Sequence, residues 1–114
     1  MKHLKKRTDF LAVARGWKWV MPGLVLQARQ NGQALSSEPR VGFTASRRVG
    51  GAVERNRAKR RLREVVREVL EGRARENFDY VVIARKAALA RPYGDLLDDL
   101  KTAIARIHAK AHKS

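Results

Sequence analysis

One stretch decides the fold: Gly51-Ala52-Val53-Glu54-Arg55-Asn56-Arg57-Ala58-Lys59-Arg60-Arg61-Leu62-Arg63-Glu64-Val65-Val66-Arg67-Glu68-Val69-Leu70. Plotted at 100° per residue, its side chains fall into three sectors. The apolar sector holds Ala58, Leu62, Val65, Val66, Val69 and Leu70. An adjoining flank without any acid holds Asn56, Lys59, Arg60, Arg63 and Arg67. We therefore predict a helix that packs its apolar sector on a core and presents a row of cations to phosphates.

The rest of this helix carries three further expectations. Glu64, Glu68 and Glu71 gather on a third side, where Arg60–Glu64 and Arg67–Glu71 can pair at i,i+4. Arg55 projects above the apolar sector, which is tolerable only if the first turn extends past the core into solvent or onto a ligand. Gly72 is placed to end the helix.

The segment just before the helix, Val49-Gly50-Gly51, suggests a phosphate cradle. Because the segment lacks the P-loop pattern, a simple turn is favoured.

Composition limits the class of protein. The 114 residues fit one domain with a modest core, and 44% hydrophobic residues argue against disorder. The 26 Lys and Arg against 11 Asp and Glu give a formal charge of +15, which indicates a polyanionic partner. Nucleic acid is favoured over an anionic membrane, because no helix combines this charge with a bulky aromatic face.

Residue types that are missing exclude several other classes. Without cysteine there is no disulfide partner, thiolate metal site or cysteine nucleophile. No signal peptide and no apolar run of transmembrane length is found, so we expect a cytoplasmic protein with no membrane partner.

Flanking segments predict the remaining elements. Residues 1–7 form a basic, mobile leader, and Thr8 caps a short helix that stops near Gly16. Residues 18–29 alternate like a strand, although Pro22-Gly23 breaks its front. A turn over residues 31–39 leads to a second strand at 40–46, with Val41, Phe43 and Ala45 on one face.

Beyond the basic helix, residues 79–84 form an apolar run typical of a strand buried on both faces. Pro92 suits the start of a last helix, and its apolar face is Leu96, Leu97, Leu100, Ala103, Ile104 and Ile107. Residues 108–114 form a basic tail that frays. The order α-β-β-α-β-α predicts a single-domain α+β sandwich over residues 1–114 with a small mixed sheet. The strands joined across Asn31-Gly32 should be antiparallel, and those flanking the basic helix parallel.

The chain offers no protein active site. Asp95, Asp98 and Asp99 near a helix start are explained by the helix dipole without a metal. His3, His108 and His112 sit near the ends without spaced partners, so we expect no catalytic and no metal-binding set. Phe10, Trp17, Trp19 and Phe43 are more typical of a core, but Phe10 could equally line a groove for unstacked bases.

Cations also gather where the predicted strands end. Arg47 and Arg48 follow one strand, and Arg85 and Lys86 follow another. Together with the basic flank they favour phosphate binding over an ordinary solvated surface.

Two stretches resemble the bacterial ribonuclease P protein component. The first is Arg40-Val41-Gly42-Phe43-Thr44-Ala45-Ser46-Arg47-Arg48-Val49-Gly50, and the second is Ala52-Val53-Glu54-Arg55-Asn56-Arg57-Ala58-Lys59-Arg60. They match that family's strand ending in Ser and two basic residues, followed by Gly-x-Ala-Val-x-Arg-Asn-Arg-x-Lys-Arg. Leu4-Lys5-Lys6, Asp9-Phe10 and Ile83-Ala84-Arg85-Lys86 are similar to the family too, so the resemblance spans nearly the whole chain.

The resemblance implies a fold and a division of labour. The fold would be ribosomal protein S5 domain 2-like, with a left-handed strand–helix–strand crossover that the general rule would not predict. An RNA subunit would be the catalyst and would cut precursor tRNA at the mature 5′ end, with Mg²⁺ bound mainly by that RNA. Residues implied to bind the RNA subunit are Arg47, Arg48, Arg55, Asn56, Arg57, Lys59, Arg60, Arg63 and Arg67.

A cleft between the first helix and the sheet is implied to hold the 5′ leader of the substrate. Its residues would be Phe10, Ala14, Gln27, Phe43, Thr44, Ser46, Arg85 and Lys86. Ala14 and Gln27 stand where the family commonly has aromatic residues. Two alternatives are a DNA-binding protein, although Gly72 ends the helix too early for a zipper, and a ribosomal protein without any role in cleavage.

Overall fold

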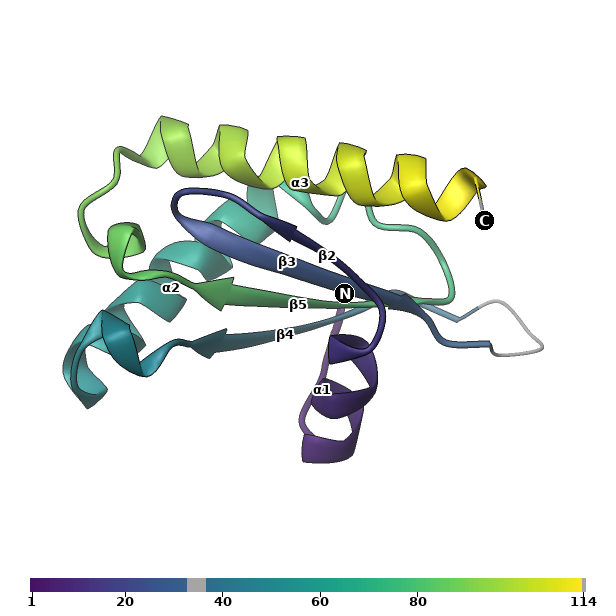
Figure 1. The fold of residues 1–114 in the computed structure, drawn as a ribbon, viewed down its shortest axis with the longest axis horizontal. Coiled ribbons are helices and arrows are strands. Elements are labelled where there is room, and N and C mark those ends of the chain that lie inside the picture. Colours follow the sequence, from purple (N-terminus) through teal and green to yellow (C-terminus); the bar gives the residue numbers. More distant parts are fainter. Residues whose placement is uncertain (33–36, 114) are drawn as a thin grey trace.

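The structure is a computed structural model that describes residues 1–32 and 37–113. The order of its elements is β1 (Lys2–His3), α1 (Arg7–Ala14), β2 (Trp17–Val20), β3 (Leu24–Gln30), β4 (Arg40–Ala45), η1 (Arg47–Val49), α2 (Ala52–Val69), β5 (Phe78–Ala84), η2 (Lys86–Leu89) and α3 (Tyr93–Lys113). In Figure 1 the sheet is the middle layer, with α2 and α3 on one face and α1 on the other. The predicted α+β class with a mixed sheet is confirmed.

The five strands lie in the order β1-β4-β5-β3-β2. β5 pairs parallel with β4 and antiparallel with β3, so β4, α2 and β5 form the predicted parallel strand–helix–strand unit. β3 and β4 run in opposite directions, as predicted, but β5 lies between them. Residues 33–36 of the predicted turn lie outside the described residues, and the handedness of the crossover stays a prediction.

The larger core lies between the sheet and the two long helices. Every residue of the predicted apolar sector of α2 is at most 4% exposed. On α3 the buried hydrophobic residues are Leu96, Leu100, Ala103, Ile104 and Ile107, and Leu97 of the predicted apolar face is half-buried. In β5, Tyr80, Val82 and Ala84 face these helices, while Val81 and Ile83 face α1. The central strand is therefore buried on both faces, as its continuous apolar sequence predicts.

Two strands are not predicted by the sequence. The segment expected to be one interrupted strand is the hairpin of β2 and β3, because Pro22-Gly23 forms its turn. Lys2–His3 pairs with Arg40 and Val41 as β1, and Leu4 is buried at 6% exposure. The expectation of a mobile leader over residues 1–7 therefore omits a strand, whose partner lies far along the chain.

The helix ends also differ in detail. α1 begins after Lys6, so Thr8 is inside the helix and is not its cap. α2 ends at Val69 with Leu70 as its C-cap, and Gly72 has no left-handed conformation. α3 continues to Lys113 through the segment expected to fray. No helix within the described residues is long and apolar enough to cross a membrane.

Two polar residues of α3 have structural partners that the sequence does not predict. Asp99 is 2% exposed, binds Arg91 through Nε at 2.8 Å and accepts the backbone N–H of Gly23 at 3.0 Å. The helix dipole therefore does not account for Asp99, whose role is to hold the turn between β2 and β3. His108 lies in the core at 8% exposure, 2.7 Å from the Tyr80 hydroxyl, rather than in a mobile tail.

Candidate nucleic-acid interface

The basic flank of α2, which is Asn56, Lys59, Arg60, Arg63 and Arg67, lies on the surface of the molecule. Lys59 is half-buried and the other four are exposed. Arg67 pairs with the exposed Glu64 at 3.3 Å, which replaces the i,i+4 pairs predicted with Glu64 and Glu71. No acid lies within ion-pair distance of the other cations of the flank, and all of these side chains belong to the described part of the chain. The charges are therefore available to an external polyanion.

Arg55 lies above the apolar sector in the first turn of α2, which extends past the core as predicted. It is half-buried and lines a hollow of about 250 Å³ between the first turns of α2 and β4. The residues of this α2–β4 hollow are Thr44, Ala45, Ala52, Arg55, Asn56 and Lys59. Two cations and an amide thus converge on one concave site, which suits a phosphate group.

Further along α2, the flank continues over the edge of the sheet. Arg63 and Arg67 line a smaller hollow with Phe43 of β4 and His3 of β1. The guanidinium of Arg63 lies 5.6 Å from the centre of the Phe43 ring, a cation–π distance that limits its freedom. The short β1 pairs only with Arg40 and Val41, so the edge of β4 is unpaired from Gly42 onward.

On the opposite face of the sheet, α1 covers only one end. This helix has eight residues and is about 12 Å long, too short to span five strands. Val13 packs against Val81, and Phe10 sits over Gly42, where an added Cβ would lie 2.5 Å from the ring. Figure 1 shows the arrow ends of β4 and β5 left without a helix on this face.

The uncovered area consists of two adjoining hollows, which together we name the sheet groove. The hollow beside α1 measures about 490 Å³ and is lined by Lys5, Arg7, Phe10, Leu11, Gln27, Phe43, Thr44 and Val81. The hollow at the strand ends measures about 420 Å³ and is lined by Val25, Ser46, Arg48, Ile83, Arg85 and Lys86. Five of these lining residues are cations and none is an acid.

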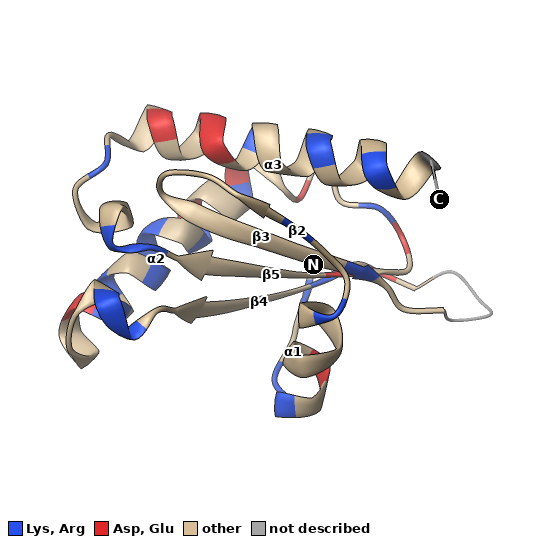
Figure 2. Ribbon diagram, in the orientation of Figure 1, with Lys and Arg blue, Asp and Glu red and all other residues tan. Residues whose placement is uncertain are grey.

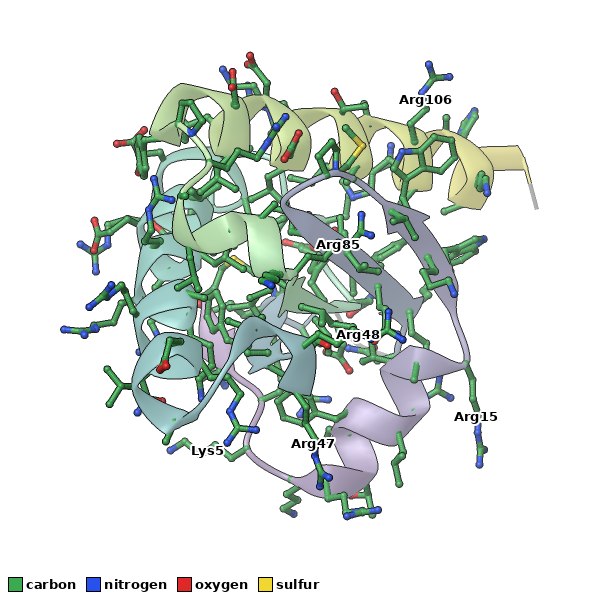
Figure 3. The ribbon with its side chains drawn as sticks, turned by 60° about the vertical axis from the view of Figure 1, so that its left-hand side comes forward. Lys5, Arg15, Arg47, Arg48, Arg85 and Arg106 are labelled. Atoms are coloured by element: carbon green, nitrogen blue, oxygen red, sulfur yellow. The ribbon has the colours of Figure 1, made fainter. Side chains whose placement is uncertain are left out.

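Local hydrogen bonds place the cations at the strand ends. The hydroxyl of Ser46 accepts the backbone N–H of Arg48 at 3.2 Å and so begins η1. Arg85 Nη1 donates to the carbonyl oxygen of Met21 at 2.8 Å. Figure 3 shows Arg48 and Arg85 at the strand ends, with Arg47 nearer to α1. Gly50, with φ at 142°, then turns the chain into α2, which explains the glycine without a phosphate cradle.

The structure brings most of the predicted cleft residues together in the sheet groove. Phe10, Gln27, Phe43 and Thr44 line the part beside α1, and Ser46, Arg85 and Lys86 line the strand-end part. Ala14, the last residue of α1, is exposed and is not among the lining residues. Arg48, predicted with the RNA-subunit set, lies with the cleft residues instead. Arg47 and Arg57 are exposed and line neither the α2–β4 hollow nor the sheet groove.

Sequence reasoning misses part of the groove: Lys5, Arg7, Leu11, Val25, Val81 and Ile83. Strand alternation places Val25 and Ile83 on a common face, but it does not show that α1 leaves this face open. Figure 2 shows the resulting distribution of charge, with cations on α2 and at the strand ends and acids in the first turns of α3.

Comparisons with known proteins show which family the sequence matches. A family model described as Ribonuclease P matches residues 1–108. The ribonuclease P protein component of Paramagnetospirillum magneticum is 52% identical over 112 residues, which cover 96% of this chain and 84% of that protein. The ribonuclease P protein component of Ruegeria pomeroyi is 48% identical, with 93% of this chain and 86% of that protein covered.

Solved structures show the same fold. The ribonuclease P protein from Thermotoga maritima is 29% identical and superposes with a TM-score of 0.75. The match covers 94% of this chain and 98% of that protein. The overall fold is therefore shared at this level of identity.

Proposed function

The chain belongs to the ribonuclease P protein family, and we propose that it is the protein subunit of the ribonucleoprotein endonuclease that removes the 5′ leader from precursor tRNA. The basic flank and the α2–β4 hollow bind the catalytic RNA subunit, and the sheet groove binds the single-stranded leader. The chain supplies binding surfaces, and the bond-breaking chemistry belongs to the RNA.

One observation carries this proposal: the two surfaces meet at Thr44. This residue lines both the α2–β4 hollow and the sheet groove at the unpaired edge of β4. A strand of RNA that leaves a partner docked on α2 can therefore pass directly onto the face of the sheet. A protein that only bound folded RNA would have no need of a second, cation-lined groove beside the first surface.

The proposed Mg²⁺ belongs to the RNA subunit. Among the residues that the structure describes, no group of three His, Asp or Glu side chains lies close enough together to hold a metal ion. We therefore assign no metal-dependent step to this chain. Its cations act by reducing repulsion between the phosphates of the two RNAs, which lowers the concentration of divalent ion needed for them to associate.

Reconstitution tests the proposal. The purified chain and its cognate RNA subunit are incubated with precursor tRNA at physiological Mg²⁺, and release of the leader is followed on a gel. We expect release of the leader to depend on the chain at this Mg²⁺ concentration. At high Mg²⁺, much less of the chain should be needed for the same release. Leader release that is the same with and without the chain at every Mg²⁺ concentration would contradict the proposal and favour a ribosomal or DNA-binding role.

A further inference from the structure

The sheet groove runs across the strands rather than along them. α1 forms one wall, and the strand-end residues Arg48, Arg85 and Lys86 form the other. The strand register defines two rows of side chains on the floor between these walls. The row nearer α1 is Lys18, Gln27, Val81 and Gly42. The open row is Val20, Val25, Ile83 and Thr44.

The open row extends over four strands to the free edge of β2. At a strand spacing of about 4.8 Å, three steps cover roughly 14 Å. Lys18 and Val20 pair with Gln27 and Val25, and paired residues of antiparallel strands point to the same face. Trp17 and Trp19 point the other way, into the core against α3. β2 therefore contributes Lys18 and Val20 to the groove face.

Val20 does not contribute to either hydrophobic core. It is 51% exposed and belongs to neither core cluster. Leu11 on α1 is also 51% exposed and lines the same groove. Among the described residues, these are two of the three large hydrophobic side chains that are left exposed, the third being Val53 on α2. Apolar side chains gathered on one open face of a highly charged protein mark a binding surface.

Building on the proposed function, we propose that the leader-binding site continues across β2, where Val20 contacts the bases and Lys18 the phosphates of nucleotides farther from the cleavage site. The absence of acids and the presence of five cations along the groove suit a single RNA strand. The path has a direction: the leader enters at Thr44, beside the α2 surface, and leaves at Val20.

The chemistry of the open row also predicts low sequence preference. Its floor is built from the methyl groups of Val20, Val25, Ile83 and Thr44, which contact any base or ribose without reading hydrogen-bonding edges. The aromatic residues that line the groove, Phe10 and Phe43, both lie near the entrance, and the Phe43 ring is already in contact with the Arg63 guanidinium. We therefore expect binding at β2 to depend on the length of the leader and little on its sequence.

The test uses the reconstituted holoenzyme and precursor tRNAs whose leaders are shortened one nucleotide at a time from the 5′ end. For the wild type, affinity should rise with leader length and then reach a plateau. For Val20→Thr and Lys18→Gln, which keep the strand, the last increments should disappear, with roughly threefold to tenfold weaker binding of the longest leaders only. Lys101→Gln on the exposed side of α3 removes the same charge as Lys18→Gln and should leave every increment unchanged.

Two outcomes would overturn the inference while the proposed function stands. One is that the Val20 and Lys18 variants keep the full gain of the wild type, and the other is that they weaken the shortest and longest leaders equally. A wild type without any gain from leader length would overturn leader binding itself and the inference with it. As a test independent of substitution, a photoreactive uridine moved along the leader should crosslink to residues 17–20 only from its distal positions. Crosslinks to that strand from the nucleotide next to the cleavage site would contradict the proposed direction.

Discussion

Arg40 donates two hydrogen bonds to Asp79 across the parallel pair of β4 and β5, from Nε at 2.9 Å and from Nη2 at 2.7 Å. This pairing with Asp79 raises the pKa of Arg40 above its ordinary value. Nη1 of the same guanidinium lies 3.5 Å from the carboxylate of Asp9 in α1. One side chain thus ties together the central strand, its parallel neighbour and the helix that forms a wall of the groove.

Removing Arg40 should destabilise the protein more than removing Asp79. Asp79 is 4% exposed, so Arg40→Ala leaves a carboxylate buried without a partner, and we expect a loss of about 3 kcal/mol in the free energy of unfolding. Asp79→Ala should cost less, because the Arg40 side chain is 31% exposed and still reaches Asp9 and water. Urea denaturation of both variants checks the order, which would be refuted if Asp79→Ala were the more damaging.

Gly42→Ala should move α1. The added methyl group would lie 2.5 Å from the Phe10 ring and 3.2 Å from Leu4 Cβ, so the ring must leave its place on the sheet. Overpacking of this kind typically destabilises by about 1–3 kcal/mol. We also expect faster hydrogen exchange of the amides of α1 and weaker leader binding, because the wall of the groove is displaced.

Gly72→Ala is the matched control for this substitution. No atom lies within 4 Å of a Cβ added there, and its backbone is not left-handed. Its unfolding free energy should therefore be unchanged or slightly raised. Equal stability of the Gly42 and Gly72 variants would show that α1 does not depend on the close approach of Phe10 to β4.

The elements that the sequence predicts well are those whose signal lies within one segment. α2 has three distinct sectors over eighteen residues, and β5 has an uninterrupted apolar run. β1 has only two residues and gains its structure from pairing with a strand almost forty positions away, so no local pattern marks it. The sequence predicts Pro22-Gly23 as a break within one strand rather than as a turn, because alternation continues on both sides of it.

The candidate site also has one part that the sequence predicts and one part that it does not. The cations of the basic flank follow from helical periodicity, and the structure leaves all of them except Arg67 free of acidic partners within its described residues. The sheet groove depends on which part of a face is left bare, and this is decided by the length of α1 and the position of Phe10 over Gly42. For the same reason His108 could not be placed from sequence, since its partner Tyr80 lies in another element.

Stability should fall in weakly acidic solution because of His108. The Tyr80 hydroxyl accepts the backbone N–H of Arg75 at 3.1 Å, which leaves its own proton available to the neutral His108 ring, whose Nε2 lies 2.7 Å away. Burial, with a smaller effect of the Arg75 charge, lowers the pKa of His108 to about 4. The unfolded chain, with an ordinary histidine pKa of about 6.5, takes up the proton first as the pH falls. The stabilisation is therefore complete above about pH 6.5 and is lost toward pH 4.

Comparison with His108→Gln isolates this contribution, because glutamine cannot titrate in this range. We expect the difference in unfolding free energy between wild type and variant to shrink by on the order of 2 kcal/mol between pH 7 and pH 4. Urea denaturation at several pH values measures it. A difference that is independent of pH would mean that the histidine is equally protonated in the folded and unfolded chains.

The exposed arginines of α2, which are those of the basic flank and the neighbouring Arg57, make a prediction that depends on position and not only on charge. Replacing Arg57 and Arg60 by Ala should weaken binding of the RNA subunit, and the slope of log K against log salt should fall by roughly one for each phosphate that is no longer neutralised. The control variant, Lys101→Ala with Arg106→Ala, removes two cations from α3. Figure 3 shows that Arg106 lies far from Arg47 and Arg48. This control should keep the wild-type slope, because counterions are released only where a cation meets a phosphate. If both double variants reduced the slope equally, net charge and not the surface of α2 would determine binding.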